Sequence, residues 1–293
     1  MKRNNTYDTP NIIAEIGCNH KGDFNIAKRL IEEALRSGVT IVKFQKRNNK
    51  ELLTESQYNA IHPNPMHSYG ATYGDHREYL EFSIDQHYEL KEYAEGLGLT
   101  YSSSVWDLIS AKEISKLGTT MIKIPSACNN HIQMLEFLRD EYKGQVHVSF
   151  GMTNYEEEER LVDLFEEKNQ SHRLVIYACT SGYPVSFNDV CLLEILRLKD
   201  KFINRVKDIG FSGHHLGISI DIAAYTLGAK WIERHFTLDR TWKGTDHAAS
   251  LEPGGMSKLV RNLNATFTSL SYKRKQILDI EKEQRDKLKY RKR

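Results

Sequence analysis

Two lysines stand inside short apolar runs of the kind that form buried β-strands. Lys43 lies in VKF and Lys123 in IKI, each between large apolar side chains. A buried ammonium group without a partner is costly, so each lysine needs an anion nearby. That anion could be an internal carboxylate, Glu15 or Glu233, or a phosphorylated ligand, which we favour. A lysine at a strand centre could also form a Schiff base with a carbonyl substrate.

Two histidines end the last two strand-like runs. His214 follows GFSG and His235 follows WIER, so on neighbouring parallel strands they would lie roughly 5 Å apart. Two neutral imidazoles at that spacing can hold one divalent metal ion, with water or substrate oxygens in the remaining positions. Glu233 could ligate or support the metal, and His215 would point away from His214. Hydrogen-bonded structural histidines are the alternative, since the sequence has no HExxH or other dense ligand motif.

Nearly every strand-like run ends in polar or ionisable side chains after an apolar start. These positions are Glu15, His20, Lys43, Gln45, Ser102, Ser103, Ser104, Lys123, Ser126, Ser149, Thr180 to Tyr183, Ser212, His214, His215 and His235. Serine hydroxyls and lysine ammonium groups together suit a phosphorylated ligand. After the last run, Lys243, Asp246 and His247 stand in a Gly-containing loop, where Asp246 could bind sugar hydroxyls or merely cap a turn. EIGCNHKG lacks the GxGxxG spacing, which excludes a dinucleotide-binding fold.

Eight strand-like runs alternate with amphipathic helical segments along the chain. The runs are 11–17, 40–46, 99–105, 121–127, 145–151, 173–179, 208–214 and 230–237. The helical segments include 24–37, 86–97, 154–169, 217–228 and 255–270. This alternation predicts an α/β fold, a (β/α)8 TIM barrel, with an open doubly wound sheet as the alternative. In a barrel the C-terminal strand ends meet at one mouth, which brings the polar side chains together.

The segment 47–80 is longer than an ordinary loop between a strand and a helix. It carries His62, His67, Tyr69, Tyr73, His76 and Arg77, with Gly70 and Gly74 as candidate hinges. We predict a lid or substrate loop over the mouth, with a tolerated surface insertion as the alternative. The predicted domains are therefore a barrel at 1–270 with this insertion, and a charged tail or linker at 271–293 that holds ten basic and four acidic residues.

Composition excludes several classes of protein. Of 293 residues, 40% are hydrophobic and 27% charged, which suits a folded core. The formal net charge of +2 gives no electrostatic case for binding nucleic acid. No apolar run reaches the roughly 18 residues of a membrane helix, and MKRNNTYDTP lacks the apolar stretch of a secretory signal. The four cysteines form no CxxC pair, so we expect a cytoplasmic protein without a disulfide frame or structural zinc site.

Nine motifs in unbroken order over about residues 10–270 resemble the sialic acid synthase family. They are AEIGCNHKGD, VKFQK, TYGDHREYLEFS, KIPSACNN, SFGMTN, CTSGYP, GFSGHHLGI, ERHFTLD and KGTDHAASLEPG. The TYG-H, SGH and TWKG-DH forms are most similar to the animal-type enzymes, which make N-acylneuraminate 9-phosphate or its deaminated analogue. The resemblance implies a barrel that condenses phosphoenolpyruvate with an N-acetylmannosamine-type sugar, free or as the 6-phosphate. The products would be a nonulosonic acid and phosphate, formed by C–O cleavage with a divalent metal, manganese or magnesium.

The resemblance also implies a role for each matching residue. Phosphoenolpyruvate would be held by Lys43, Ser104, Lys123, Ser126, Ser149 and Ser212, and the metal by His214 and His235. The acceptor sugar and the attacking water would face Glu15, Gln45, Tyr183 and Asp246. These roles make a Schiff-base lysine a less favoured interpretation than lysines that bind phosphoenolpyruvate. The rival functions are a pyruvate-dependent aldolase and a non-catalytic sugar-binding or phosphate-binding barrel.

Two departures from the family pattern bear on the acceptor. Cys128 stands where the family usually has an acidic residue. Family members are homodimers that normally continue into a small antifreeze-like domain, which closes over the partner subunit's site and lends it an arginine. The tail IEKEQRDKLKYRKR resembles the linker before that domain. We therefore expect that the acceptor is bound differently, that another chain supplies the cap, or that the sequence is a piece of a longer protein.

Overall fold

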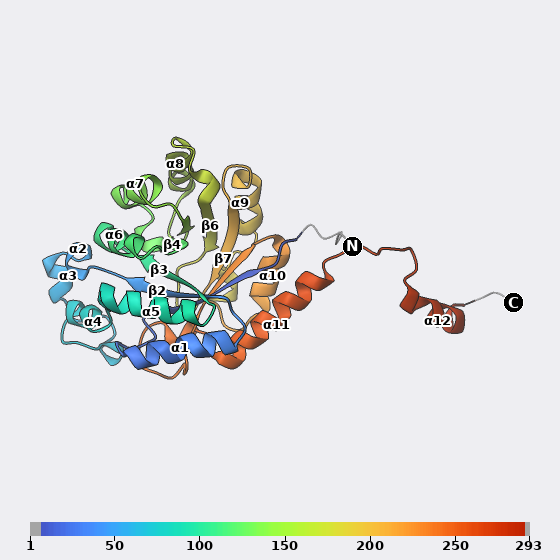
Figure 1. The fold of residues 1–293 in the computed structure, drawn as a ribbon, viewed down its shortest axis with the longest axis horizontal. Coiled ribbons are helices and arrows are strands. Elements are labelled where there is room, and N and C mark those ends of the chain that lie inside the picture. Colours follow the sequence, from blue (N-terminus) through green and yellow to red (C-terminus); the bar gives the residue numbers. More distant parts are fainter. Residues whose placement is uncertain (1–6, 291–293) are drawn as a thin grey trace.

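Eight parallel strands close into a barrel in the computed structural model, which describes residues 7–290 (Figure 1). The strands are β1 (Asn11–Gly17), β2 (Ile41–Lys46), β3 (Thr100–Val105), β4 (Met121–Ile124), β5 (Gln145–Ser149), β6 (Leu174–Cys179), β7 (Asp208–Gly213) and β8 (Trp231–His235). Each strand pairs with the next in chain order, and β8 pairs with β1. The predicted (β/α)8 barrel is confirmed, and the alternative of an open doubly wound sheet is wrong.

One helix packs outside the barrel after each strand. These helices are α1 (Phe24–Arg36), α5 (Ile84–Gly96), α6 (Leu108–Lys116), α7 (Ile132–Asp140), α8 (Tyr155–Glu166), α9 (Glu194–Phe202), α10 (Ser219–Leu227) and α11 (Pro253–Ser269). In α1 the side chain of Asp23 caps the first turn by accepting from the backbone N–H groups of Asn25 and Ile26. The buried residues of α1 recur at helical spacing, so one face of the helix covers the strands.

Alternate strand residues face two separate cores. The larger core lies between strands and helices and includes Ile16, Phe44 and Ile122. The smaller core is a cluster of Ile13, Ile41, Met121, Val175, Tyr177 and Trp231. The strand register sets Glu15 level with Lys43 on one side and with His235 on the other. Polar groups on neighbouring strands therefore form one layer, as side chains inside a barrel do.

The segment 47–80 folds into short helices between β2 and α5. They are α2 (Asn49–Leu52), α3 (Glu55–Asn59), the 3₁₀ turn η1 (Pro65–His67) and α4 (Tyr73–Tyr79), and Figure 1 shows α2, α3 and α4 grouped at one side of the barrel. The segment touches the loop after β8, because the Tyr69 hydroxyl donates to the Lys243 carbonyl. Gly74 lies inside α4, where a Cβ atom would overlap the Tyr58 ring, so close packing accounts for this glycine.

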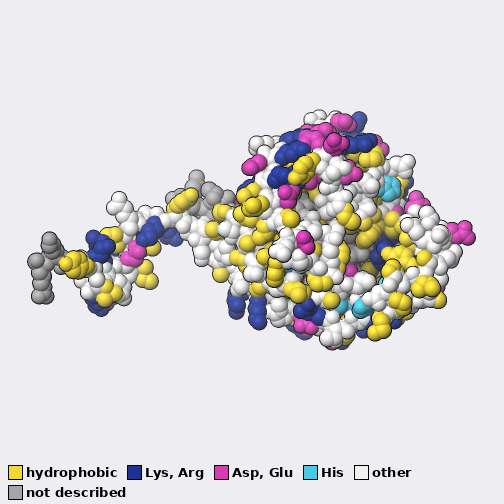
Figure 2. Space-filling view, turned by 180° about the vertical axis from the view of Figure 1, so that it is seen from behind, with side chains coloured by type: hydrophobic (Ala, Val, Ile, Leu, Met, Phe, Trp, Pro, Cys, Tyr) yellow, Lys and Arg dark blue, Asp and Glu magenta, His cyan; other side chains and the backbone are white. Residues whose placement is uncertain are grey.

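A last helix, α12 (Asp279–Leu288), stands apart from the barrel beyond α11, as both Figure 1 and Figure 2 show. Its residues are exposed or half-buried. Between residues 7 and 290, none of the helices combines the length and the apolar character that crossing a membrane demands.

Candidate active site

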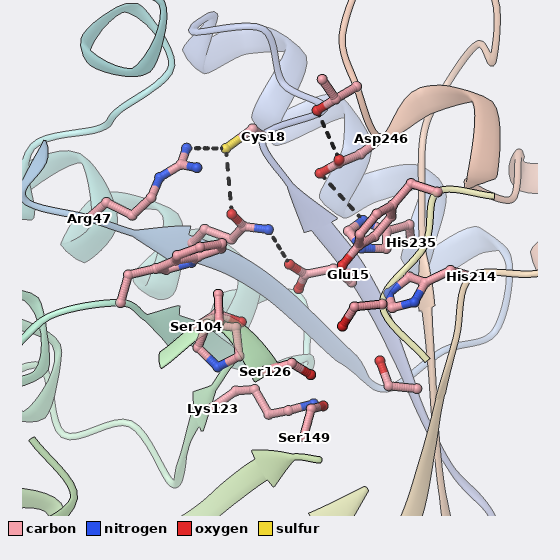
Figure 3. Close-up of a pocket in the computed structure, with 18 of the residues that line it drawn as sticks. Glu15, Cys18, Arg47, Ser104, Lys123, Ser126, Ser149, His214, His235 and Asp246 are labelled. Carbon is pink, nitrogen blue, oxygen red and sulfur yellow. Dashed lines mark hydrogen bonds and ion pairs between the residues drawn. The ribbon is translucent and has the colours of Figure 1, made fainter. Parts of the chain in front are cut away.

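One cavity of about 400 Å³ opens among the C-terminal strand ends and takes in side chains from the whole ring of strands. All twelve residues predicted to form the site line this cavity. Figure 3 shows several of them, among them Glu15, Lys123, His214 and Asp246. The other strand-end candidates His20, Ser102, Ser103, Thr180 and His215 are not among the lining residues. His20 stacks on Phe82 with 4.0 Å between ring centroids, His215 contacts Phe211 of the larger core, and the Ser102 hydroxyl donates to the Met121 carbonyl.

The inner end of the cavity is built from two buried lysines and two buried carboxylates. Lys43 forms an ion pair with Glu15, its Nζ lies 2.6 Å from Ser104 Oγ, and it is 3.7 Å from Glu233 Oε1. Lys123 Nζ lies 3.0 Å from Glu233 Oε2. The internal ion pairs left open by the sequence are therefore present, and Glu233 binds the lysines.

The Glu233 carboxylate, at the centre of this group, stays ionised. Burial opposes the ionisation of Glu233, yet Lys123 and Lys43 together hold its pKa well below the ordinary value. Burial lowers the pKa of Lys123, although its ion pair with Glu233 works against that shift. For Glu15, burial outweighs the attraction of Lys43 and raises its pKa. The two carboxylates thus differ in how readily each takes a proton.

Serine hydroxyls surround the lysines on the neighbouring strand ends. Ser212 Oγ donates to Glu233 Oε1 at 3.2 Å, and Ser126 Oγ accepts the backbone N–H of Gly151 at 3.0 Å. Ser149 is buried and lines the cavity. Ser181, which belongs to the predicted strand-end stretch from Thr180 to Tyr183, also lines the cavity, and its buried hydroxyl has no hydrogen-bond partner in the described chain. These groups supply neutral donors beside the ammonium charges, an arrangement that suits phosphate or carboxylate oxygens.

The two histidines lie side by side, with 5.4 Å between their ring centroids. His214 Nδ1 is 3.0 Å from the Thr180 carbonyl, so it donates there and leaves the Nε2 lone pair available. Burial, followed by the nearby His235, lowers the pKa of His214 to about 3, so this ring is neutral at pH 7. His235 Nδ1 is buried, without a hydrogen-bond partner in residues 7–290, and 3.9 Å from Asp246 Oδ2.

This donor set fits a divalent metal ion. It offers two imidazole rings, with an orphaned nitrogen on His235 and a carboxylate close by. The pKa of Asp246 stays below the ordinary value, because His235 and a hydrogen bond from Thr245 outweigh the opposing effect of burial. No three His, Cys, Asp or Glu side chains within residues 7–290 surround a common point. Water or substrate would therefore complete the coordination, as in catalytic rather than structural sites.

A buried charge network outside the barrel fixes the backbone next to both histidines. Arg234, which precedes His235, donates to Asp221 Oδ2 at 2.5 Å and to the His215 carbonyl at 2.6 Å. His215 therefore points away from His214, as predicted. The network joins the ends of β7 and β8, so it holds the two ring-bearing positions at a fixed separation.

A chain of polar contacts runs from Glu15 toward the mouth. Gln45 Nε2 donates to Glu15 Oε1 at 2.9 Å, Cys18 Sγ lies 3.8 Å from Gln45 Oε1, and Arg47 Nη2 lies 2.7 Å from Cys18 Sγ. Burial raises the pKa of Cys18 to about 12, so it stays a thiol. Sequence reasoning missed Arg47, which lies just past the strand pattern. In the described chain, Cys128 is buried and lies outside the set of lining residues.

The chain is similar in sequence to known proteins. The model of the NeuB family matches residues 30–275. N-acetylneuraminate-9-phosphate synthase of Homo sapiens is 38% identical over 282 residues, which are 94% of this chain and 76% of that protein. N,N'-diacetyllegionaminic acid synthase of Campylobacter jejuni is 36% identical over 249 residues, 85% of this chain and 73% of the relative.

Solved structures show the same architecture. The N-acetylneuraminic acid synthetase of Leptospira borgpetersenii in complex with citrate superposes with a TM-score of 0.81 and 29% identity, over 97% of this chain and 94% of that one. A truncated 3-deoxy-D-arabino-heptulosonate 7-phosphate synthase from Thermotoga maritima, at 15% identity and a TM-score of 0.65 over 92% of this chain and 90% of that one, shares the fold alone.

Proposed function

This chain belongs to the NeuB family, and from that premise we propose that it condenses phosphoenolpyruvate with an N-acetylmannosamine-type sugar to give a nonulosonic acid and phosphate. One observation carries the proposal. A single cavity holds two lysines and five serines beside the His214 and His235 pair and the Asp246 carboxylate. The lysines and serines suit an anionic enol ester. The histidines and the carboxylate suit a sugar aldehyde.

The lysine end would bind phosphoenolpyruvate. Lys123 has one carboxylate partner, Glu233, so further N–H groups of its ammonium remain to donate. Lys43, already held by Glu15 and Ser104, adds positive charge without moving. The serine hydroxyls complete a set of donors whose positions are fixed before the ligand arrives. Prearranged donors of this kind favour a developing phosphate leaving group, since they need no reorganisation during the reaction.

The histidine end would bind the sugar. A divalent metal ion, manganese or magnesium, held by His214 and His235 would polarise the sugar aldehyde. Tyr183 packs against His214 with 4.3 Å between ring centroids, and burial raises the pKa of its phenol. The hydroxyl therefore stays protonated and can donate to a sugar oxygen. The Asp246 carboxylate lies on the same side and can accept from a sugar hydroxyl.

The proposed reaction forms a C–C bond and breaks a C–O bond. C3 of the enol ester attacks the open-chain aldehyde, whose oxygen gains a proton. Water then adds to C2 and loses a proton, and the resulting tetrahedral centre expels phosphate together with the bridging oxygen. Glu15, with its pKa raised by burial, suits the removal of the proton from water. Gln45 donates to Glu15 Oε1 and so fixes the direction in which this carboxylate points.

The test is turnover by the purified 293-residue chain with manganese, phosphoenolpyruvate, and either N-acetylmannosamine or its 6-phosphate. We expect one phosphate released for each nine-carbon acid seen by mass spectrometry, and no product when pyruvate replaces phosphoenolpyruvate. Product from pyruvate, without phosphate release from phosphoenolpyruvate, would instead identify an aldolase. Binding of both substrates without turnover would identify a non-catalytic barrel.

A further inference from the structure

One end of the cavity is lined by side chains of the segment 47–80. Tyr73, His76 and Arg77 come from α4, and Arg47 follows β2. Figure 3 shows Arg47 on the side of the cavity away from His214 and His235. The carboxylates that line the cavity belong to β1, β8 and the loop after β8. The α4 end therefore contributes cations and donors to the lining.

The guanidinium of Arg77 lacks a compensating anion. Arg47 is paired with Glu81, which accepts from both its side chain and its backbone N–H. By contrast, within residues 7–290 no carboxylate oxygen lies within 4.0 Å of Arg77. Its group lies over the Trp106 ring at 5.3 Å. Burial, and then the positive charge of Arg47, lower the pKa of Arg77, as expected for a cation that still needs a partner.

Three neighbouring groups offer hydrogens and no negative charge. The Tyr73 hydroxyl oxygen accepts from Arg77 Nη2 at 2.6 Å and Nε at 3.1 Å, so its own hydrogen is free to donate. His76 Nδ1 accepts the Tyr69 N–H at 3.1 Å, which leaves the proton of the neutral ring on Nε2. Burial, and next the nearby His62, lower the pKa of His76 to about 4. Trp106 Nε1, buried beside them, has no acceptor in the described chain.

We infer that Arg77, with Tyr73 and His76, forms a subsite for a phosphate ester on the acceptor sugar, at the end remote from its aldehyde. The inference rests on the proposed function for the identity of the sugar. A planar guanidinium beside neutral N–H and O–H donors is the arrangement that proteins use for phosphate oxygens. The inserted segment 47–80 would then bind substrate, because α4 supplies the three named side chains.

The test compares N-acetylmannosamine 6-phosphate with N-acetylmannosamine as acceptor for the wild-type chain, Arg77→Gln and Arg77→Lys. We expect wild type to prefer the 6-phosphate. Arg77→Gln should lower the ratio of kcat/KM for the 6-phosphate to kcat/KM for the free sugar by about 10- to 100-fold, as loss of hydrogen bonds to a charged group does. Arg77→Lys should recover part of the ratio. Arg29→Gln, at an exposed position on α1, is the matched control and should keep the wild-type ratio.

Two results in Arg77→Gln would overturn the subsite. One is an unchanged ratio, with or without an equal loss for both sugars. The other is a rise confined to the KM of phosphoenolpyruvate, which would assign Arg77 to that substrate's phosphate. Calorimetric binding of the two sugars, without phosphoenolpyruvate, separates this inference from the proposed function. If no condensation occurs, Arg77→Gln must still weaken binding of the 6-phosphate relative to the free sugar. Absence of 6-phosphate binding to wild type would contradict the inference.

Discussion

Lys123 of β4 and Glu233 of β8 meet across the barrel interior, with Nζ 3.0 Å from Oε2. The strands that carry them lie on opposite sides of the closed sheet, so this ion pair spans the inner end of the cavity. Both side chains are buried. Lys123 also lies over the Tyr177 ring at 3.7 Å, which joins the charged layer to the smaller apolar core.

Removing the carboxylate of this pair should destabilise the fold strongly. Glu233→Gln leaves the Lys123 ammonium buried without a counter-ion, and we expect a loss of about 3–5 kcal/mol in the free energy of unfolding. The double variant Lys123→Met with Glu233→Gln should be more stable than Glu233→Gln alone, because no unpaired charge remains. Urea denaturation measures both. Asp279→Asn, which breaks an exposed ion pair with Lys275, is the control and should match wild type. A double variant less stable than Glu233→Gln would contradict the account.

Metal dependence should follow His214 and His235. Chelation should abolish turnover, and added manganese should restore it. His235→Ala should remain folded, lower turnover by at least about 100-fold and lose the manganese signal in electron paramagnetic resonance, because one of only two imidazole donors is gone. The exposed His172→Ala should behave as wild type. Full activity and unchanged manganese binding in His235→Ala would contradict the proposal that His235 holds the metal.

Stability should fall as the pH drops below about 6.5, the ordinary histidine pKa. Burial, with the charge of Arg47 next for His20 and of Lys46 next for His87, lowers the pKa of each to about 3. Below pH 6.5 the unfolded chain therefore binds protons at these histidines that the folded chain does not bind. The contribution of the two histidines to the free energy of unfolding is fully present above pH 6.5 and declines toward pH 3. Each histidine adds a slope of at most about 1.4 kcal/mol per pH unit. Urea midpoints between pH 7 and 4.5 should decline less steeply in His87→Gln. An unchanged slope would show that His87 is not responsible.

The contact between Tyr69 and the loop after β8 should restrain the inserted segment. Tyr69→Phe loses the hydrogen bond to the Lys243 carbonyl but keeps the stacking on Tyr79, whose ring centroid is 5.0 Å away. We expect limited proteolysis within 47–80 to become up to about tenfold faster, the effect of one hydrogen bond, with an unchanged global unfolding midpoint. Tyr88→Phe on α5 is the control. Equal cleavage rates would mean that this contact does not hold the segment in place.

The strands and their polar ends could be predicted from sequence because each strand alternates between two environments. Apolar residues such as Phe44 face the helices, while Lys43 and Gln45 face the cavity, so a period of two is visible in six residues. Strand ends were less accurate. β4 stops at Ile124, three residues before the predicted end, because Pro125 has no N–H for the ladder.

The sequence placed Tyr73, His76 and Arg77 in a predicted lid or substrate loop, but their contacts at the α4 end of the cavity could not be predicted. Arg77 reaches the cavity because α4 places it against Tyr73 and over Trp106, which follows β3. That contact joins residues far apart in sequence and leaves no periodic signal. Likewise, sequence left open whether Lys43 and Lys123 pair with carboxylates or await a ligand. The structure shows the ion pairs, and the proposed ligand would add to them.

The fate of one oxygen atom tests the proposed chemistry most directly. Phosphoenolpyruvate labelled with ¹⁸O in the bridge between C2 and phosphorus is given to the full chain with manganese and an N-acetylmannosamine-type acceptor, and both products are analysed by mass spectrometry. The account predicts that all the label leaves in inorganic phosphate and that the nine-carbon acid carries none. Label retained in the acid, or phosphate release without a C–C-bonded product, would contradict it.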